Sequence, residues 1–143
     1  MSNGVKDLMV YQKAFDAAVK IQKLSYKFPP HEIYALTKQI RCSSRSVCSN
    51  LSEGYRKRIY PKHFLCKLTD ADMEANETVT WLDFAKAFGY ITEEEHRYLH
   101  AEYIHIGNML GQMEKYPSKF APRSAAAFIG GLIILTATLF YLI

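Results

Sequence analysis

The sequence lacks the short motifs around which most enzyme active sites and metal centres are built. It has no glycine-rich phosphate loop, no His-Glu-x-x-His element and no nucleophile elbow. Its three cysteines are an odd number without zinc-ligand spacing, which indicates reduced cytosolic thiols rather than a disulfide framework. No stretch alternates cleanly between apolar and polar residues, as a half-buried strand would. We therefore expect an all-α protein that is not an enzyme and binds no cofactor or metal.

Charge is missing from one end of the chain. Residues 124–143 form a run of 20 without a charged side chain. As a helix this run would be about 30 Å long, which matches the hydrocarbon core of a bilayer, whereas a buried core helix is the alternative. Lys115, Lys119 and Arg123 precede the run, so the positive-inside rule keeps the rest of the chain in the cytoplasm. We predict a transmembrane helix at 124–143, a basic juxtamembrane linker at 118–123, and a bacterial inner-membrane location.

The predicted membrane helix carries small residues that suit helix packing. Ala126 and Gly130 share one face with Thr138, and Gly131 follows directly. Small side chains let membrane helices approach closely. The residues at the start of the chain carry charge and no apolar stretch, so we expect no secretory leader and a tail-anchored topology. The lipid bilayer is therefore one expected partner, and other copies of the same helix are another.

Four helical patterns precede this segment, each bounded by proline or glycine. Phe28-Pro29-Pro30 and Tyr60-Pro61 interrupt the pattern, Gly89 stops it again, and Thr92 to Glu95 reads as a capping box. Short links between helices favour antiparallel neighbours, so residues 1–117 are predicted to form an up-down four-helix bundle. The expected helices cover residues 5–27, 31–58, 62–88 and 92–116.

Each helix carries a stripe at spacings of three and four that we expect to face the core. The second stripe includes the polar residue Asn50 and the small residue Gly54, with Glu53 beside them. Asn50 and Glu53 are expected to form inter-helix or inter-subunit hydrogen bonds that fix register and oligomeric state, or else to contact a ligand. The four stripes are Leu8, Tyr11, Phe15, Ala18 and Gln22; Ile33, Leu36, Ile40, Ser43, Val47, Asn50 and Gly54; Phe64, Leu68, Ala71, Ala75, Thr78, Leu82 and Ala85; and Leu99, Tyr103, Ile106, Leu110 and Met113.

The densest positive charge lies around the second interruption. Phosphate backbones are bound by such basic clusters when aromatic rings lie among them, as Tyr55 and Tyr60 do here. The alternative is a solvated helix end whose positive charge complements the helix dipole. The predicted basic patch consists of Arg45, Arg56, Lys57, Arg58 and Lys62.

Acidic and histidine side chains on the last two predicted helices are weaker candidates for chemistry. Asp70, Glu74 and Glu77 share a helix face, where a salt-bridge face or a subunit contact is a commoner use than a catalytic pair. His96 and His100 have the i, i+4 spacing of metal ligands, which is also the spacing of ordinary exposed histidines. We assign neither group a catalytic or metal-binding role.

The order of several motifs resembles a bacterial four-helix-bundle family first noticed as proteins encoded in intervening sequences of 23S ribosomal RNA genes. The same pattern is similar to the accessory variability determinant of diversity-generating retroelements. Asp72-Met73-Glu74 departs from it, because the family usually has a basic residue, glycine and serine there. The residues that carry the resemblance, within about 6–116, are Phe28-Pro29, Glu32, Tyr34, Leu36, Gln39, Arg41, Ser46, Asn50-Leu51, Glu53-Gly54, Arg56, Phe64-Leu65, Ala71, Glu77-Thr78 and Phe88 to Ile91.

The resemblance implies a bundle that assembles into a ring-like homopentamer. For the retroelement members it also implies binding to nucleic acid and to a reverse transcriptase through a basic surface. We expect Gln39, Arg41, Asn50 and Glu53 to contact another subunit or a ligand. The combined hypothesis is a homo-oligomer that gathers membrane helices, either as a membrane effector or pore, in bacterial defence with an activating protein, or as a passive membrane scaffold. The alternative is a nucleic-acid-binding accessory protein tethered to the membrane.

Overall fold

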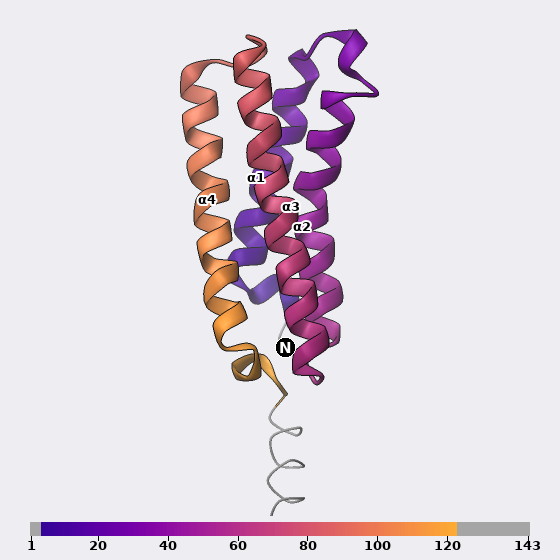
Figure 1. The fold of residues 1–143 in the computed structure, drawn as a ribbon, viewed down its shortest axis with the longest axis vertical. Helices are drawn as coiled ribbons and strands as arrows, with labels where there is room; N and C mark the ends of the chain where they lie inside the picture. Colours follow the sequence, from indigo (N-terminus) through magenta and orange to yellow (C-terminus); the bar gives the residue numbers. More distant parts are fainter. Residues whose placement is uncertain (1–3, 123–143) are drawn as a thin grey trace, which may run out of the picture.

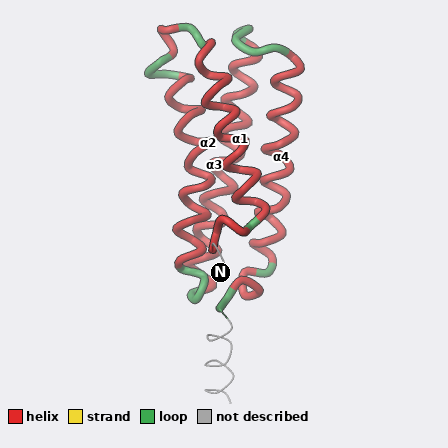
Figure 2. Tube along the Cα trace, turned by 180° about the vertical axis from the view of Figure 1, so that it is seen from behind, coloured by secondary structure: helices red, strands yellow, loops and turns green. Residues whose placement is uncertain are grey.

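The protein is an antiparallel bundle of four long helices. The computed structural model describes residues 4–122, in which no strand occurs. Figures 1 and 2 show the helices running alternately up and down, with the first and last described residues at the same end, drawn lowest. Each helix packs against its neighbour in sequence, and α1 closes the bundle against α4. The helices are α1 (Met9–Leu24), α2 (Leu36–Arg56), α3 (Pro61–Ala87) and α4 (Glu93–Lys115).

Short 3-10 turns cover the ends of the bundle. The turns η1 (Gly4–Asp7), η2 (Ser25–Lys27) and η3 (Pro30–Glu32) flank α1 and lead into α2. The second helix therefore begins at Leu36 rather than at residue 31 as predicted. The Glu32 carboxylate accepts a hydrogen bond from the Leu36 amide at 3.1 Å, which satisfies a free amide at the start of α2.

The predicted glycine stop after the third helix and the predicted capping box of the fourth helix are both confirmed. Gly89 adopts a φ of 77° after α3, a left-handed conformation that glycine adopts without strain. At the start of α4 the Thr92 hydroxyl accepts from the Glu95 amide at 3.1 Å. The Glu95 carboxylate accepts in turn from the Thr92 amide at 2.8 Å, which completes the capping box.

The core follows the predicted stripes of three helices but not that of the first. From α2, α3 and α4 the stripe residues Ile40, Leu68 and Ile106 are fully buried, although Ile33, which precedes α2, is exposed. In α1 the predicted stripe is wrong, since only its Ala18 is buried. The residues of α1 that face the core lie beside that stripe and are mostly small, namely Val10, Ala14, Ala17 and Ile21.

Helices α2 and α3 make the most extensive contact in the bundle. Buried Ser43 accepts a hydrogen bond from the Thr78 hydroxyl at 2.8 Å. Near the lower end, a Cβ on Gly54 would lie 2.8 Å from the Lys67 Cβ and 3.3 Å from a ring carbon of Phe64. Real Cβ contacts are not that short, so α3 approaches this glycine as closely as its missing side chain allows.

The last described turn, η4 (Pro117–Phe120), overlaps the predicted linker at 118–123 and packs on the bundle. Its Phe120 ring lies 5.8 Å from the Phe64 ring of α3. Within residues 4–122 no helix has the length and apolarity needed to cross a membrane. The membrane helix predicted at 124–143, with Ala126, Gly130, Gly131 and Thr138 as its packing residues, lies outside the described residues.

Candidate interaction surfaces

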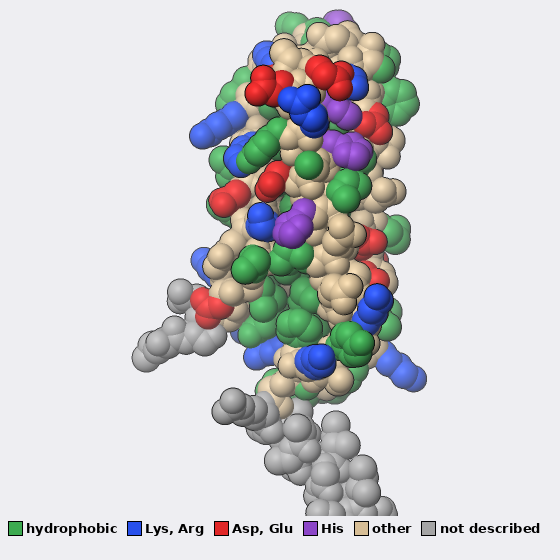
Figure 3. Space-filling model, turned by 90° about the vertical axis from the view of Figure 1, so that its left-hand side faces the viewer, with side chains coloured by type: hydrophobic (Ala, Val, Ile, Leu, Met, Phe, Trp, Pro, Cys, Tyr) green, Lys and Arg blue, Asp and Glu red, His purple; other side chains and the backbone are tan. Residues whose placement is uncertain are grey.

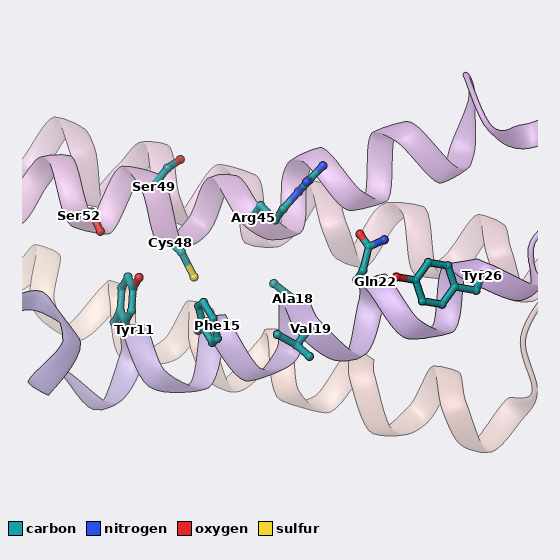
Figure 4. A pocket seen from close by; sticks show the side chains of 10 residues that line it. All are labelled: Tyr11, Phe15, Ala18, Val19, Gln22, Tyr26, Arg45, Cys48, Ser49 and Ser52. Carbon is teal, nitrogen blue, oxygen red and sulfur yellow. The ribbon is translucent and has the colours of Figure 1, made fainter.

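A groove lies on the described surface between α1 and α2. Its volume is about 670 Å³. The apolar rings and chains of α1 form one wall, and polar side chains of α2 form the other (Figure 4). Phe15 and Val19 are 52% and 39% exposed, and Tyr26 beyond them is 70% exposed. The lining residues, here called the α1–α2 groove, are Tyr11, Phe15, Ala18, Val19, Gln22, Tyr26, Arg45, Cys48, Ser49 and Ser52.

The α1–α2 groove contains the stripe that the sequence placed in the core. Phe15 and Ala18 were both predicted to face the core, yet the Phe15 ring lies at the surface. Helix α1 therefore has two apolar stripes, of which one is buried, whereas the other includes the exposed Phe15 ring, which residues 4–122 leave uncovered. An exposed apolar surface of this kind is a candidate interaction site.

The groove has no arrangement suited to catalysis. Its one thiol, Cys48, points between α1 and α2 in Figure 4, and burial raises the pKa of this thiol to about 11. A thiol with a raised pKa is a poor nucleophile at neutral pH. Arg45 donates a hydrogen bond from Nε to the Arg41 carbonyl at 2.8 Å, and no carboxylate lines the groove. These contacts suit the binding of an apolar surface rather than chemistry on a substrate.

Asn50 and Glu53 lie on the other side of α2, where they join α2 to α3. The Lys67 ammonium of α3 donates to Asn50 Oδ1 at 3.2 Å and pairs with Glu53 at 2.8 Å. Asn50 also donates to the Ser46 carbonyl at 3.0 Å. The ion pair lowers the pKa of Glu53 and raises that of Lys67. Both residues therefore act in an inter-helix contact within this chain.

The four residues predicted to share one contact are separated by the fold. Arg41 donates from Nε to Ser25 Oγ at 2.7 Å and lies 5.3 Å from the centre of the Tyr26 ring, so it ties α2 to the end of α1. Gln39 is exposed on α2. Contact of Gln39, Arg41, Asn50 and Glu53 with another subunit or a ligand stays a prediction.

The fold also separates the members of the predicted basic patch. Arg45 lies in the α1–α2 groove, 11 residues before Arg56, which is about 16 Å along a helix. The other four members lie together at the lower end, where three further lysines from other elements join them. None of these seven forms a salt bridge within residues 4–122. We call them the basic end: Lys6, Arg56, Lys57, Arg58, Lys62, Lys115 and Lys119.

The acidic residues and histidines are mostly engaged with neighbours. Asp70 lies 3.6 Å from the Lys67 ammonium, and Glu77 accepts from the Trp81 indole at 2.9 Å. His96 lies 2.7 Å from the Asp83 carboxylate. Burial raises the pKa values of Asp72, Glu74 and Glu114. In the described part of the chain no three metal-ligating side chains lie close enough to hold an ion.

Comparison with known proteins identifies the bundle. The family model of the 23S rRNA-intervening sequence protein matches residues 6–112. The crystal structure of a protein with unknown function from the S23 ribosomal protein family of Bacteroides thetaiotaomicron has a TM-score of 0.68 and 29% identity, covering 74% of this chain and 95% of that chain. None of the curated proteins matches the chain. With the bundle matched over most of its length, the chain belongs to the 23S rRNA-intervening sequence protein family.

Proposed function

We propose that this protein is a membrane-anchored, self-assembling bundle that works as a scaffold or membrane effector and not as an enzyme. The observation that carries the proposal is the α1–α2 groove, whose apolar residues Phe15 and Val19 are exposed within residues 4–122. Burial of apolar side chains between subunits is the main driving force of such assemblies. The occupant we propose for the groove is a second copy of this chain.

A second apolar surface on the same bundle favours assembly into a ring. Trp81, Phe84 and Phe88 form a row on α3, with ring centres 6.0 and 5.7 Å apart, and Phe84 and Phe88 are both exposed. This row and the α1–α2 groove are different surfaces, separated by α2. When two unlike surfaces of identical subunits meet, the contact repeats from copy to copy and closes into a ring if the rotation allows it.

The described chain ends at the lower end of the bundle (Figure 1), and this position favours a membrane anchor there. The uncharged residues 124–143 follow in sequence. A ring of bundles with parallel axes would bring all of these segments to one side. Gathered membrane helices could disrupt the bilayer, as in a defence effector, or only hold a partner protein there.

Membrane potential in expressing bacterial cells distinguishes the two forms of the proposal. We expect depolarisation by the full-length chain but not by a chain ending at Pro122 or by Phe15→Glu, which places a charge in the groove. Ile104→Glu is the matched control, since Ile104 is an exposed apolar residue of α4 outside the groove. If the full-length chain is found in the membrane fraction but causes no depolarisation, the scaffold form of the proposal stands. If the full-length chain is found outside the membrane fraction, the anchor is refuted.

A second candidate function is a nucleic-acid-binding accessory protein, acting with a reverse transcriptase. The basic end favours it, because Tyr55, Tyr60 and Tyr116 lie among the basic side chains and bases can stack on such rings. Binding of single-stranded RNA that weakens steeply with salt would support this function. The absence of binding at low salt would exclude it.

A further inference from the structure

The positive charge of the protein is concentrated at one end of the bundle. Seven Lys and Arg side chains of the basic end face three carboxylates there, Asp7, Glu53 and Glu114. In the rest of residues 4–122, ten basic side chains face eleven acidic ones. Figure 3 shows blue side chains around the lower end, whereas red and blue are mixed farther up. The excess charge of the chain therefore belongs to this end and not to the bundle as a whole.

Five separate elements and the turn between α2 and α3 build the basic end. Lys6 comes from η1, which lies beside the end of α2, because a Cβ on Gly4 would be 3.7 Å from the Tyr55 ring. Arg56 ends α2, Lys57 and Arg58 lie in the turn that follows, and Lys62 lies at the start of α3. Lys115 comes from α4 and Lys119 from η4. Residues far apart in sequence thus bring their charge to one end of the bundle.

Aromatic and apolar side chains lie among these charges. Tyr60 and Tyr116 are exposed, as is Ile59 at the tip of the turn between α2 and α3. The Arg58 guanidinium lies 3.9 Å from the centre of the Tyr55 ring, and the Lys119 ammonium lies 4.2 Å from that of Tyr116. Tyrosine rings beside Lys and Arg are characteristic of protein surfaces at the headgroup level of a membrane.

We infer that the basic end is a binding surface for anionic phospholipid headgroups, so that the bundle stands on the membrane with this end down. The inference rests on the proposed anchor, since the described chain stops at this same end and the uncharged residues 124–143 follow. An anchor that begins within a few residues of Lys119 keeps the basic end within reach of the lipid surface, whereas no such constraint would bring it to a nucleic acid.

Two components of the membrane would meet the basic end. The ammonium and guanidinium groups would pair with lipid phosphates, while Ile59 and the two exposed tyrosines would enter the boundary between headgroups and acyl chains. Each Lys or Arg near an anionic surface increases binding about fivefold. Exchanging two of the seven lysines and arginines for glutamate should therefore reduce binding by at least about 25-fold.

The bundle without its anchor is a suitable probe for this surface. The core residues all lie between Val10 and Met113, and the crystallised relative is a chain of which 95% matches this bundle. Residues 1–122 therefore form a complete folding unit. Sedimentation with vesicles of phosphatidylcholine alone, and with vesicles containing 30% phosphatidylglycerol, measures headgroup binding without insertion of the tail.

We expect 1–122 to bind the anionic vesicles, to release them at high salt, and to ignore the neutral vesicles. Lys57→Glu with Lys62→Glu should weaken binding by at least about 25-fold. The matched control is Lys23→Glu with Lys38→Glu, which makes the same change in charge on exposed lysines toward the other end of the bundle and should leave binding unchanged. Circular dichroism of both double variants verifies that the bundle is folded.

Failure of the lipid surface and failure of the anchor give different results. If 1–122 ignores anionic vesicles while the full-length chain is recovered with membranes, the headgroup surface is refuted and the anchor stands. If neither associates with membranes, both are refuted. If single-stranded RNA displaces 1–122 from the vesicles at equal phosphate concentration, the basic end is a nucleic-acid surface and the inference is overturned.

Discussion

Replacing Gly54 with alanine tests how closely α2 and α3 approach each other. The added Cβ would lie 2.8 Å from the Lys67 Cβ and 3.3 Å from the Phe64 ring. Neither neighbour can yield cheaply, because the Lys67 Cβ is fixed to the backbone of α3 and the Phe64 ring is fully buried. The two helices must therefore separate locally, and the hydrogen bond between Lys67 and Asn50 must lengthen with them.

Two opposing effects determine the size of this change. Inserting a methyl group into a well-packed contact costs about 1–3 kcal/mol. Alanine in place of glycine inside a helix contributes about 0.5–1 kcal/mol in the favourable direction. We expect a net loss of about 1–2 kcal/mol in the free energy of unfolding, which for a bundle of this size lowers Tm by roughly 4–8 °C.

Chemical denaturation of residues 1–122, followed by circular dichroism at one fixed protein concentration, measures the change. The control is Gly111→Ala in α4, where an added Cβ meets nothing within 4 Å. That variant should gain about 0.5–1 kcal/mol from helix propensity alone. If Gly54→Ala is as stable as Gly111→Ala, the inference that α2 and α3 approach each other closely at Gly54 is wrong.

Three further predictions concern groups that the fold buries. Tyr103→Phe should raise the free energy of unfolding by up to about 1 kcal/mol, because no partner within residues 4–122 has good hydrogen-bond geometry with the buried hydroxyl, whose polar neighbour is the Ser44 side chain; a loss of similar size would show that it is bonded to Ser44. In thiol labelling at pH 8, Cys48 should react about 100-fold more slowly than an ordinary thiol, because burial raises its pKa from 9.0 to about 11, whereas exposed Cys42 should react readily; equal rates would contradict the burial of Cys48. Asp72→Asn should stabilise the bundle at pH 7, because burial raises the pKa of this carboxyl and so penalises its ionised form in the folded state. The gain should vanish below pH 3.8, where the unfolded chain also protonates the group, and a gain independent of pH in urea denaturation would refute this cause.

The sequence was sufficient to predict the bundle because three of its helices have one apolar stripe each. Leu68 on α3 and Ile106 on α4 were predicted to be buried and are fully buried. The prediction was wrong for α1, which has a stripe of large residues beside one of small residues. Large side chains favoured the stripe with Phe15, yet the small side chains of Ala14 and Ala17 face the core. Only the packing of α1 against its neighbours distinguishes two stripes on one helix.

The candidate surfaces were predicted less completely than the fold, because they also depend on how the helices pack against one another. Spacing along α2 placed Arg45 and Arg56 in one patch, but the helix puts them about 16 Å apart. Lys6 was not included, because nothing in its local sequence shows that η1 packs beside the end of α2. The inter-helix role of Asn50 was among the predicted alternatives, and its partner Lys67 was not predicted, because the pairing depends on the register between α2 and α3.

Self-assembly through the α1–α2 groove is the central claim, and the mass of the native particle tests it most directly. Native mass spectrometry of the full-length chain, released from detergent micelles, should show a closed oligomer of more than two copies. Phe15→Glu should convert it to monomers, and Ile104→Glu should leave it intact. A full-length chain that is monomeric at micromolar concentration, or an oligomer that Phe15→Glu does not disturb, would contradict the claim.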